Sequence, residues 1–433
     1  MTTISIRATP IRATPPEAAI DAERWPDVAV AAGSSVRAAV ARALFTNAVT
    51  QLPLHVKLPD GRTIGGGQKG APVMILRRPR EFYRRFGASG LIGFGESYLA
   101  GDWDAASETG DDLTALLTVF AEHATELVPP WLQRLRTLAV RRQPPGDLQT
   151  VTGARRNIGR HYDLSNELFA LFLDETMTYS AAIFADPEDA TDLAGAPDLT
   201  EAQRRKIDRL LDRAGVGRGC RLLEIGTGWG ELAIRAARRG ATVRSITISR
   251  EQAELAARRV AAAGLAGQVH VELCDYRDVQ GQFDAICSVE MLEAVGERYW
   301  DTFFAALDQH LAPGGRVGLQ TITMPHDRML ATRNTYTWIQ KYIFPGGLLP
   351  SVTAIGDSLS RTRLRIVQRE DYGPHYAQTL RIWRERFGAH ADEVARLGFD
   401  QVFRRMWNFY LSYSEAGFRA GYIDVSQLTL ARI

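Results

Sequence analysis

Residues 222–230 read Leu222-Leu223-Glu224-Ile225-Gly226-Thr227-Gly228-Trp229-Gly230. The apolar residues predict a buried strand, and the three glycines predict a tight turn that leads into a helix. Glycine lets the backbone approach a bound molecule closely, and the amino end of a helix carries partial positive charge. The stretch therefore predicts a strand, a turn and a helix that hold a nucleotide-like ligand.

The sequence around this turn alternates between short apolar runs and amphipathic segments. Predicted strands cover residues 221–225, 242–247, 269–273, 283–289 and 316–322. Predicted helices cover residues 201–214, 231–239, 250–263 and 299–311. Such alternation is typical of a doubly wound α/β fold with a mostly parallel sheet, in which ligands bind beyond the carboxyl ends of the strands.

The kind of ligand follows from what the turn lacks. Its glycines are spaced GxGxG rather than GxGxxG, and the next predicted strand ends in Ile246-Thr247-Ile248-Ser249 without a carboxylate. A dinucleotide site needs an acidic residue there to hold the ribose, so NAD is disfavoured. Glu224 suits S-adenosylmethionine, which carries a cationic sulfonium and an amino group. A packing turn that binds nothing is the alternative.

A length of 433 residues predicts about two or three domains. Residues 1–30 repeat Arg-Ala-Thr-Pro, have no apolar period and are expected to be a disordered tail. A smaller α+β domain is expected over 31–146, and the doubly wound domain over 147–433. Within the smaller domain, helices are predicted over 36–49, 112–125 and 130–141. The first of these is predicted from apolar residues at helical spacing: Val36, Val40, Ala43 and Leu44.

Composition excludes several classes of protein. Lys and Arg number 52 and Asp and Glu 50, a net charge of +2, which disfavours a bulk nucleic-acid binder. No apolar run approaches the ~18 residues of a spanning helix, and no signal peptide is recognised, so a cytoplasmic location is expected. Cys220, Cys274 and Cys287 form no CxxC pair, so free thiols are expected, with neither disulfide nor metal.

Several further motifs, in the same order along the chain, resemble the cyclopropane-fatty-acid synthase family of S-adenosylmethionine-dependent methyltransferases. The matching stretches are His161–Asn166, Thr178-Tyr179-Ser180, Leu223–Gly230, Thr247–Gln252, Cys274–Asp278, Ser288–Gly296, Lys341–Pro345, Tyr376, Trp383-Arg384, Tyr410 and Gly417-Phe418-Arg419. Residues 93–103 are similar to the N-terminal domain of the long members. Within the family, Ser288–Val295 and Ile322–His326 are most similar to the branch that forms tuberculostearic acid.

The resemblance implies a class I methyltransferase fold with a seven-stranded, mostly parallel sheet. It implies C-methylation of the cis double bond of oleoyl-type phospholipid acyl chains, which gives a 10-methylene precursor of tuberculostearate. Cyclopropane formation on the same substrate is the alternative, and an inactive lipid- or cofactor-binding protein is a more remote one. The implied cofactor-binding residues are Tyr179, Ser180, Glu224, Gly226, Gly228, Thr247, Gln252, Tyr276 and Arg277.

The implied catalytic residues are Glu293, Tyr376 and Gln320, and here the chain departs from the family. The cyclopropane-forming members hold a bicarbonate ion with a Cys, a Glu, a His and a Tyr. Ala181 and Gln320 stand at the Cys and His positions, and Ala294 replaces a further His. Gln320 can exchange hydrogen bonds but cannot take up a proton. We therefore expect Glu293 to be the base, directly or through bicarbonate or water, with a lesser part for Glu290.

A phospholipid substrate implies peripheral association with the inner face of an anionic membrane. Arginine runs at 77–85, beside Phe82, Tyr83 and Phe86, and at 134–142 suit such a surface. The family also suggests a homodimer. No second dinucleotide motif is present, so reduction of a methylene product requires a reductase on another chain.

Overall fold

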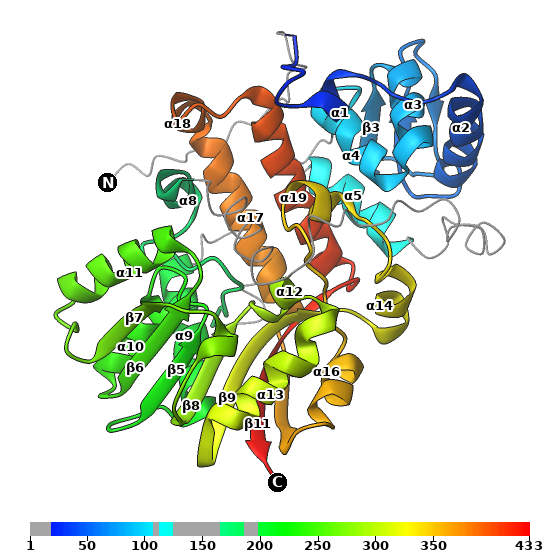
Figure 1. The fold of residues 1–433 in the computed structure, drawn as a ribbon. Helices are drawn as coiled ribbons and strands as arrows, with labels where there is room; N and C mark the ends of the chain where they lie inside the picture. Colours follow the sequence, from blue (N-terminus) through cyan, green and yellow to red (C-terminus); the bar gives the residue numbers. More distant parts are fainter. Residues whose placement is uncertain (1–18, 107–111, 124–164, 186–197) are drawn as a thin grey trace. The chain divides into compact units, whose positions relative to one another are not determined.

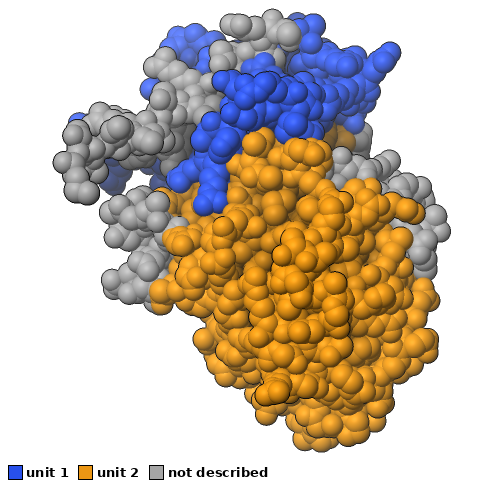
Figure 2. All heavy atoms as spheres, turned by 90° about the vertical axis from the view of Figure 1, so that its left-hand side faces the viewer, with its two compact units in different colours: residues 1–141, 383–420 blue, residues 142–382, 421–433 orange. Residues whose placement is uncertain are grey.

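The computed structural model describes residues 19–106, 112–123, 165–185 and 198–433. The chain divides into two compact units, each of which collects two stretches of sequence. Unit 1 comprises residues 1–141 and 383–420, and unit 2 comprises residues 142–382 and 421–433 (Figure 2). The sequence placed the boundary at 146/147 and all of 147–433 in one domain. The structure differs in assigning residues 383–420 to the unit that contains residues 1–141.

Unit 2 is built on a seven-stranded sheet in the order β10-β11-β9-β8-β5-β6-β7 (Figure 1). The strands are β5 (Arg221–Ile225), β6 (Thr242–Thr247), β7 (Val269–Leu273), β8 (Phe283–Val289), β9 (Leu311–Thr323), β10 (Leu364–Asp371) and β11 (Asp424–Arg432). All neighbours from β9 to β7 are parallel, whereas β11 runs antiparallel to β9 and β10. The predicted α/β class, with a mostly parallel seven-stranded sheet, is confirmed.

Helices cover both faces of this sheet. They include α9 (Leu199–Ala214), α10 (Glu231–Arg238), α11 (Arg250–Ala262), α13 (Trp300–His310) and α16 (Val352–Leu359). Side chains alternate along β5, so Leu223 and Ile225 join the core cluster that contains α13 and α16, while Leu222 joins the cluster of α9 and α10. Glu224 and Gln320 therefore lie on the sheet face that α9 covers. This placement matters because both are predicted site residues.

Two local features of unit 2 differ from the prediction. Pro313-Gly314-Gly315 was expected to be a turn before a strand at 316, but β9 already begins at Leu311, and its register with β8 shifts between Phe283 and Ala285. The glycines form an irregular start to the strand. The antiparallel strands β10 and β11 were not predicted. Alternate side chains of β10 are exposed, whereas β11 is buried along most of its length although four of its residues are polar or charged within Asp424–Thr429.

Unit 1 contains a four-stranded sheet in the order β2-β1-β3-β4. Its strands are β1 (His55–Lys57), β2 (Thr63–Ile64), β3 (Val73–Leu76) and β4 (Trp103–Ala106). Its helices include α1 (Pro26–Ala29), α2 (Ser35–Val49), α3 (Pro79–Ser89), α4 (Leu91–Ala100), α5 (Asp112–Glu122), α18 (Ala391–Arg396) and α19 (Gln401–Arg419). Buried Arg405 of α19 donates to the Tyr98 carbonyl (2.7 Å) and pairs with Asp104 (2.7 Å). These bonds explain why α19 belongs to unit 1.

Three predictions for unit 1 concern the N-terminal tail, the helix over 130–141 and the helix over 36–49. Residues 26–29 of the expected tail are helical, and Val28 is fully buried; residues 1–18 lie outside the described part. The helix predicted over 130–141 also lies outside it. Finally, the helix predicted over 36–49 is present as α2, but Val36, Val40 and Leu44 are exposed. Ala41, Phe45 and Val49 are buried instead, because Phe45 packs edge-on against Phe82 of α3, with 5.0 Å between ring centroids.

Three arginines of the predicted basic run at 77–85 form ion pairs within unit 1. Arg85 is buried and pairs with Asp102 at 2.7 Å. Arg78 pairs with the same carboxylate (2.9 Å), and Arg77 with Asp104 (2.7 Å). These ion pairs stabilise unit 1, and of the three arginines only Arg85 is buried. The second run, at 134–142, lies outside the described residues.

Candidate active site

The glycine turn follows β5 as predicted and leads directly into α10. Gly226 and Gly228 have φ angles of +96° and +51°, a region that residues with a side chain rarely adopt. A Cβ at Gly226 would also approach the Met291 side chain to 3.1 Å, whereas one at Gly228 would meet nothing within 4 Å. The turn therefore leaves an open cradle beside backbone that approaches closely, which fits a bound cosubstrate.

Glu224 supplies a buried carboxylate just before this turn. Ser245 of β6 donates its hydroxyl hydrogen to Glu224 Oε2. Burial raises the pKa of Glu224 to about 8, against the opposing effects of the Ser245 bond and the Lys206 ammonium. A carboxylate whose ionisation is this costly gains when a cation binds next to it. Glu224 thus suits the sulfonium and amino groups of S-adenosylmethionine.

The end of β6 presents a hydroxyl and an amide. Thr247 Oγ1 donates to Gln252 Oε1 (2.9 Å) and accepts from the Ser249 backbone N–H (3.1 Å). Ser249 caps the first turn of α11, which fixes Gln252 at the same edge. Both predicted residues are buried, and they stand where a dinucleotide site has its ribose-binding acid. The arrangement suits neutral hydrogen bonding to ribose hydroxyls.

Tyr276 and Arg277 lie in a short 3₁₀ helix, η2 (Tyr276–Asp278), beyond the end of β7. The Arg277 guanidinium donates to both oxygens of Asp275, at 2.7 and 2.6 Å, and its carbon lies 5.3 Å from the Tyr276 ring centroid. Burial raises the pKa of Tyr276 to about 12, so its hydroxyl stays protonated. Arg277 thereby orders this loop through Asp275.

Tyr179 and Ser180 reach the site from the segment that precedes α9. The Tyr179 ring packs edge-on against Phe169, 5.1 Å between centroids, on α8 (Asn166–Phe172). The same helix anchors the turn, since Trp229 Nε1 donates to Asn166 Oδ1 (2.8 Å). Residues 161–164 of the matching motif lie outside the described part.

Lys206 of α9 is a site residue that the sequence analysis missed. Its fully buried ammonium donates to Ser180 Oγ at 2.6 Å. Burial lowers its pKa to about 8, while Glu290, Asp174 and Glu224 oppose that fall. One signal was available, because Lys206 lies four residues before Leu210 and hence on the apolar face of the predicted helix.

Glu290, which the sequence analysis gave a minor part, is the centre of the polar network beyond β8. Its Oε1 accepts from the Ala181 backbone N–H and from Gln320 Nε2, both at 2.9 Å. Its Oε2 accepts from the Tyr376 hydroxyl at 2.6 Å. Tyr376 lies on α17 (Gly373–Ala389), far along the chain. Two of the three predicted catalytic residues, Gln320 and Tyr376, therefore converge on this carboxylate.

The orientation of the Gln320 amide is fixed from its far side. Gln427 of β11 donates its Nε2 to Gln320 Oε1 at 3.0 Å, and also donates to the Lys206 carbonyl at 3.2 Å. Since the Gln320 oxygen accepts, its nitrogen is left to donate to Glu290. Gln320 is therefore a neutral donor where the resemblance has a histidine.

Glu293 lies on α12 (Leu292–Val295), one turn beyond Glu290. Its Oε1 accepts from Thr321 Oγ1 (3.0 Å) and from the Ile322 backbone N–H. Its Oε2 is buried and has no hydrogen-bond partner among the residues that the structure describes. Burial, followed by repulsion from Glu290, raises its pKa to about 8. The two carboxylates, Glu290 and Glu293, therefore lie beyond the end of β8 and beside the end of β9, and their surroundings differ.

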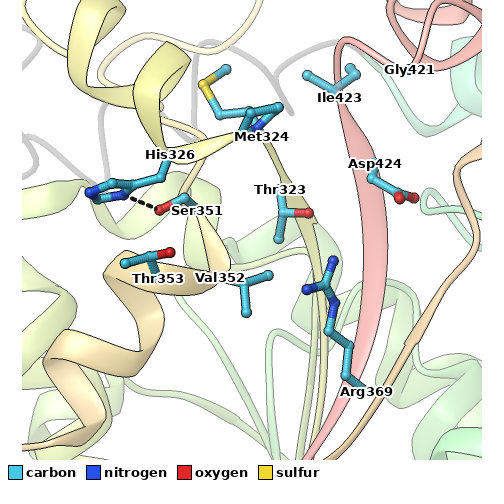
Figure 3. Close-up of a pocket in the computed structure, with 11 residues that line it drawn as sticks. Thr323, Met324, His326, Ser351, Val352, Thr353, Arg369, Gly421, Ile423 and Asp424 are labelled. Atoms are coloured by element: carbon cyan, nitrogen blue, oxygen red, sulfur yellow. Dashed lines mark hydrogen bonds between the residues drawn. The ribbon is translucent and has the colours of Figure 1, made fainter.

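A cavity of about 290 Å³ opens near the end of β9, two residues past Thr321 (Figure 3). It is lined by polar and charged side chains, among them Arg369 and Asp424, and His326 Nδ1 lies 2.8 Å from Ser351 Oγ at its wall. No predicted site residue lines it. The chemistry is therefore assigned to the ends of β5, β8 and β9 and not to this cavity.

Comparison with known proteins matches residues 149–428 to the mycolic acid cyclopropane synthetase family. The chain is 56% identical over 426 residues to tuberculostearic acid methyltransferase UfaA1 of Mycobacterium tuberculosis, covering 96% of this chain and 97% of that protein. It is 35% identical to the cyclopropane-fatty-acyl-phospholipid synthase of Escherichia coli K12, covering 84% and 88%. A solved structure of mycolic acid cyclopropane synthase CmaA1, complexed with SAH and CTAB, covers 64% of this chain and 97% of its own, with 32% identity and a TM-score of 0.58.

Proposed function

This chain belongs to the mycolic acid cyclopropane synthetase family, and on that premise we propose that it is an S-adenosylmethionine-dependent methyltransferase that acts on unsaturated acyl chains of phospholipids. The observation that carries the proposal is the pairing of an open glycine turn and buried Glu224 with the carboxylates Glu290 and Glu293 at neighbouring strand ends. The first group suits a cationic methyl donor, and the second suits removal of a proton.

The reaction needs no nucleophilic side chain. S-adenosylmethionine supplies an electrophilic methyl group as cosubstrate. The alkene π pair forms a bond to the methyl carbon while the S–CH₃ pair stays on sulfur, which becomes a neutral thioether. The neighbouring acyl carbon is left as a carbocation. The protein must therefore orient the two reactants, exclude water and accept one proton. The residues proposed to serve this end of the reaction are Glu293, Tyr376 and Gln320, together with Glu290, on which Tyr376 and Gln320 converge.

The fate of the cation sets the product. We propose that a hydride shifts from the methylated carbon to the cationic carbon, and that the new methyl group then loses a proton, giving a 10-methylene acyl chain. Similarity to the tuberculostearic acid methyltransferase over nearly the whole chain supports this course. Proton loss with direct ring closure gives a cyclopropane instead. Similarity to the cyclopropane-fatty-acyl-phospholipid synthase of Escherichia coli supports this alternative. A methylene product needs a reductase on another chain to become a methyl branch.

A single assay tests the function and separates these products. The purified chain is incubated with S-adenosylmethionine and dioleoyl phosphatidylglycerol vesicles, with distearoyl vesicles as the control. We expect S-adenosylhomocysteine only with the unsaturated lipid, and proton NMR signals of an exocyclic methylene. Upfield cyclopropane protons would support the alternative. Absence of S-adenosylhomocysteine with both lipids would refute the proposed activity and leave a binding protein.

A phospholipid substrate requires contact with a bilayer, and we propose that α2 provides it. Val36, Val40 and Leu44 lie along one side of this helix and are 72%, 55% and 37% exposed. Exposed Arg37 and Arg42 accompany them, and α2 has no acidic residue. Apolar side chains beside cations suit the surface of an anionic membrane, at about 1 kcal/mol per charge. Within the described part of the chain, no helix is long and apolar enough to cross a membrane.

Sedimentation with phosphatidylglycerol vesicles tests this surface. We expect Val40→Glu to lower the bound fraction about tenfold, since it removes an apolar contact and adds repulsion. Val367→Glu is a matched control, because Val367 of β10 is 50% exposed but lies outside α2. Binding that is insensitive to salt, or equal loss in both variants, would contradict the proposal. The homodimer stays a prediction.

A further inference from the structure

The Glu290 carboxylate is held at a fixed place by three donors from separate parts of the fold. They are the Ala181 N–H before α9, the Gln320 amide of β9 and the Tyr376 hydroxyl of α17. The residues that donate lie 109, 30 and 86 positions away along the chain. A carboxylate that receives hydrogen bonds from three elements is positioned far more tightly than a surface glutamate.

The backbone at Glu290 is also specialised. Its φ angle is +48°, which is uncommon for a residue with a side chain, and its N–H donates to the Gln320 carbonyl at 2.7 Å. The next residue, Met291, packs against Gly226 of the cosubstrate turn. The strained backbone therefore places the carboxylate between the turn after β5 and the polar end of β9.

From this geometry we propose that Glu290 is the proton acceptor of the reaction, so that the protein itself supplies the carboxylate and needs no bound bicarbonate. The inference rests on the proposed methyltransferase function and assigns its base. Every donor around Glu290 is neutral, and none gives up its proton readily, so the carboxylate is the group that accepts one. Ala181 contributes only backbone groups, since its N–H donates to Glu290 and its carbonyl accepts from Gln320 Nε2 at 3.3 Å.

The proposed step balances simply. The Glu290 carboxylate takes one proton from the methyl group of the carbocation, and the C–H electron pair becomes the second bond of the exocyclic methylene. The product is a neutral alkene and a neutral carboxylic acid, which returns its proton to solvent. Burial raises the pKa of Glu290, and the hydrogen bonds from Tyr376, Ala181 and Gln320 oppose that rise together with the Lys206 ammonium, so these groups favour the ionised form before the step. We assign Glu293 a positioning role, because its Oε1 accepts from Thr321 Oγ1 and the Ile322 backbone N–H and so holds the end of β9.

The experiment compares the wild type with Glu290→Gln and Glu290→Gly in carbonate-free buffer, with and without added bicarbonate. Glutamine keeps the shape but cannot accept the proton, and glycine both opens the space and tolerates the positive φ angle. Glu297→Gln is the matched control, because Glu297 is exposed in a short 3₁₀ helix, η3 (Glu297–Tyr299). Single-turnover formation of the methylene-branched lipid is measured beside that of S-adenosylhomocysteine, because methyl transfer releases S-adenosylhomocysteine before the proton is lost. Thermal melting and binding of S-adenosylhomocysteine check folding.

We expect the wild type and Glu297→Gln to turn over equally with and without bicarbonate. Glu290→Gln should lose about 100-fold or more, in the range of a general base, with no response to bicarbonate. Glu290→Gly should lose as much and regain about tenfold when bicarbonate fills the vacated space. A wild type that needs bicarbonate, or a folded Glu290→Gln that keeps its turnover, would overturn the inference. A wild type that forms no S-adenosylhomocysteine under either condition would refute the proposed function instead.

Discussion

The ends of β5 and β6 and the ends of β8 and β9 belong to the same edge of one sheet, but they carry different kinds of polar group. At β5 and β6 a single carboxylate, Glu224, stands among the hydroxyls of Ser245 and Thr247. At β8 and β9 there are two carboxylates, and burial together with repulsion from Glu290 raises the pKa of Glu293. The first arrangement is suited to holding a cation, and the second to taking up a proton.

The two regions also differ in how the fold builds them. The cosubstrate region is assembled from residues close to the glycine turn or on the next strand, so local sequence specifies most of it. The carboxylate region depends on Tyr376 and Ala181, which reach Glu290 from distant segments. The cosubstrate region can therefore be recognised from a sequence motif, whereas the proton-accepting region depends on contacts between distant segments.

The largest expected effect is on the cosubstrate region. Gly226→Val places a branched side chain at a φ of +96° and against Met291. We expect affinity for S-adenosylhomocysteine to fall more than about 100-fold and the unfolding free energy to fall by about 2–4 kcal/mol. Calorimetric titration and denaturant unfolding measure both. The matched control is Gly217→Val, where a Cβ meets nothing within 4 Å. Equal effects at the two glycines would contradict a special role for Gly226 in the cosubstrate region.

The carboxylate region should make the free energy of unfolding depend on pH. The pKa of Glu293 is raised to about 8 in the folded state, so folding favours its protonated form. That contribution is present below the unfolded pKa near 4.5 and is lost as pH rises through 8. Glu293→Gln stays neutral and should be more stable than the wild type by about 1–3 kcal/mol at pH 9, and by much less at pH 5. Thermal melts at both pH values decide this, and a constant difference would contradict it.

A smaller effect is expected where the two regions meet. Lys206 favours the ionised forms of both Glu224 and Glu290. In Lys206→Met the pKa of Glu290 should rise, so the acidic limb of the single-turnover pH profile should move up by about one pH unit. The plateau rate above the limb should change little. An unshifted limb with a lower plateau would show that Lys206 acts only on structure.

The sequence predicted the parallel part of the sheet well, for a physical reason. The strands β5, β6, β7 and β8 begin and end where predicted, because each is an apolar run with polar or glycine residues on both sides. The buried face of α2 could not be predicted in the same way. Val36, Val40 and Leu44 share one helical face and Ala41, Phe45 and Val49 another, so only packing against α3 decides between them.

The same distinction between local and distant contacts applies to the candidate site. Glu224, Thr247 and Gln252 were predictable, because motif and strand end fix their places. Glu290 was undervalued, because neither its positive φ angle nor the arrival of Tyr376 can be read from neighbouring residues. The prediction that Arg85 belongs to a basic surface was wrong for a related reason, because its buried partner Asp102 lies in another segment of the chain. What sequence reasoning missed are contacts between distant segments.

The most direct test measures binding and chemistry separately in Glu224→Gln and Glu290→Gln. Dissociation constants for S-adenosylhomocysteine are determined together with single-turnover rates at saturating S-adenosylmethionine and dioleoyl phosphatidylglycerol. We predict that Glu224→Gln weakens binding about 10- to 100-fold with little change in the saturated rate. Glu290→Gln should keep its affinity and lose about 100-fold or more in rate. If both variants lost affinity and rate together, or if Glu290→Gln kept its rate, the division between a cosubstrate region and a proton-accepting region would be wrong.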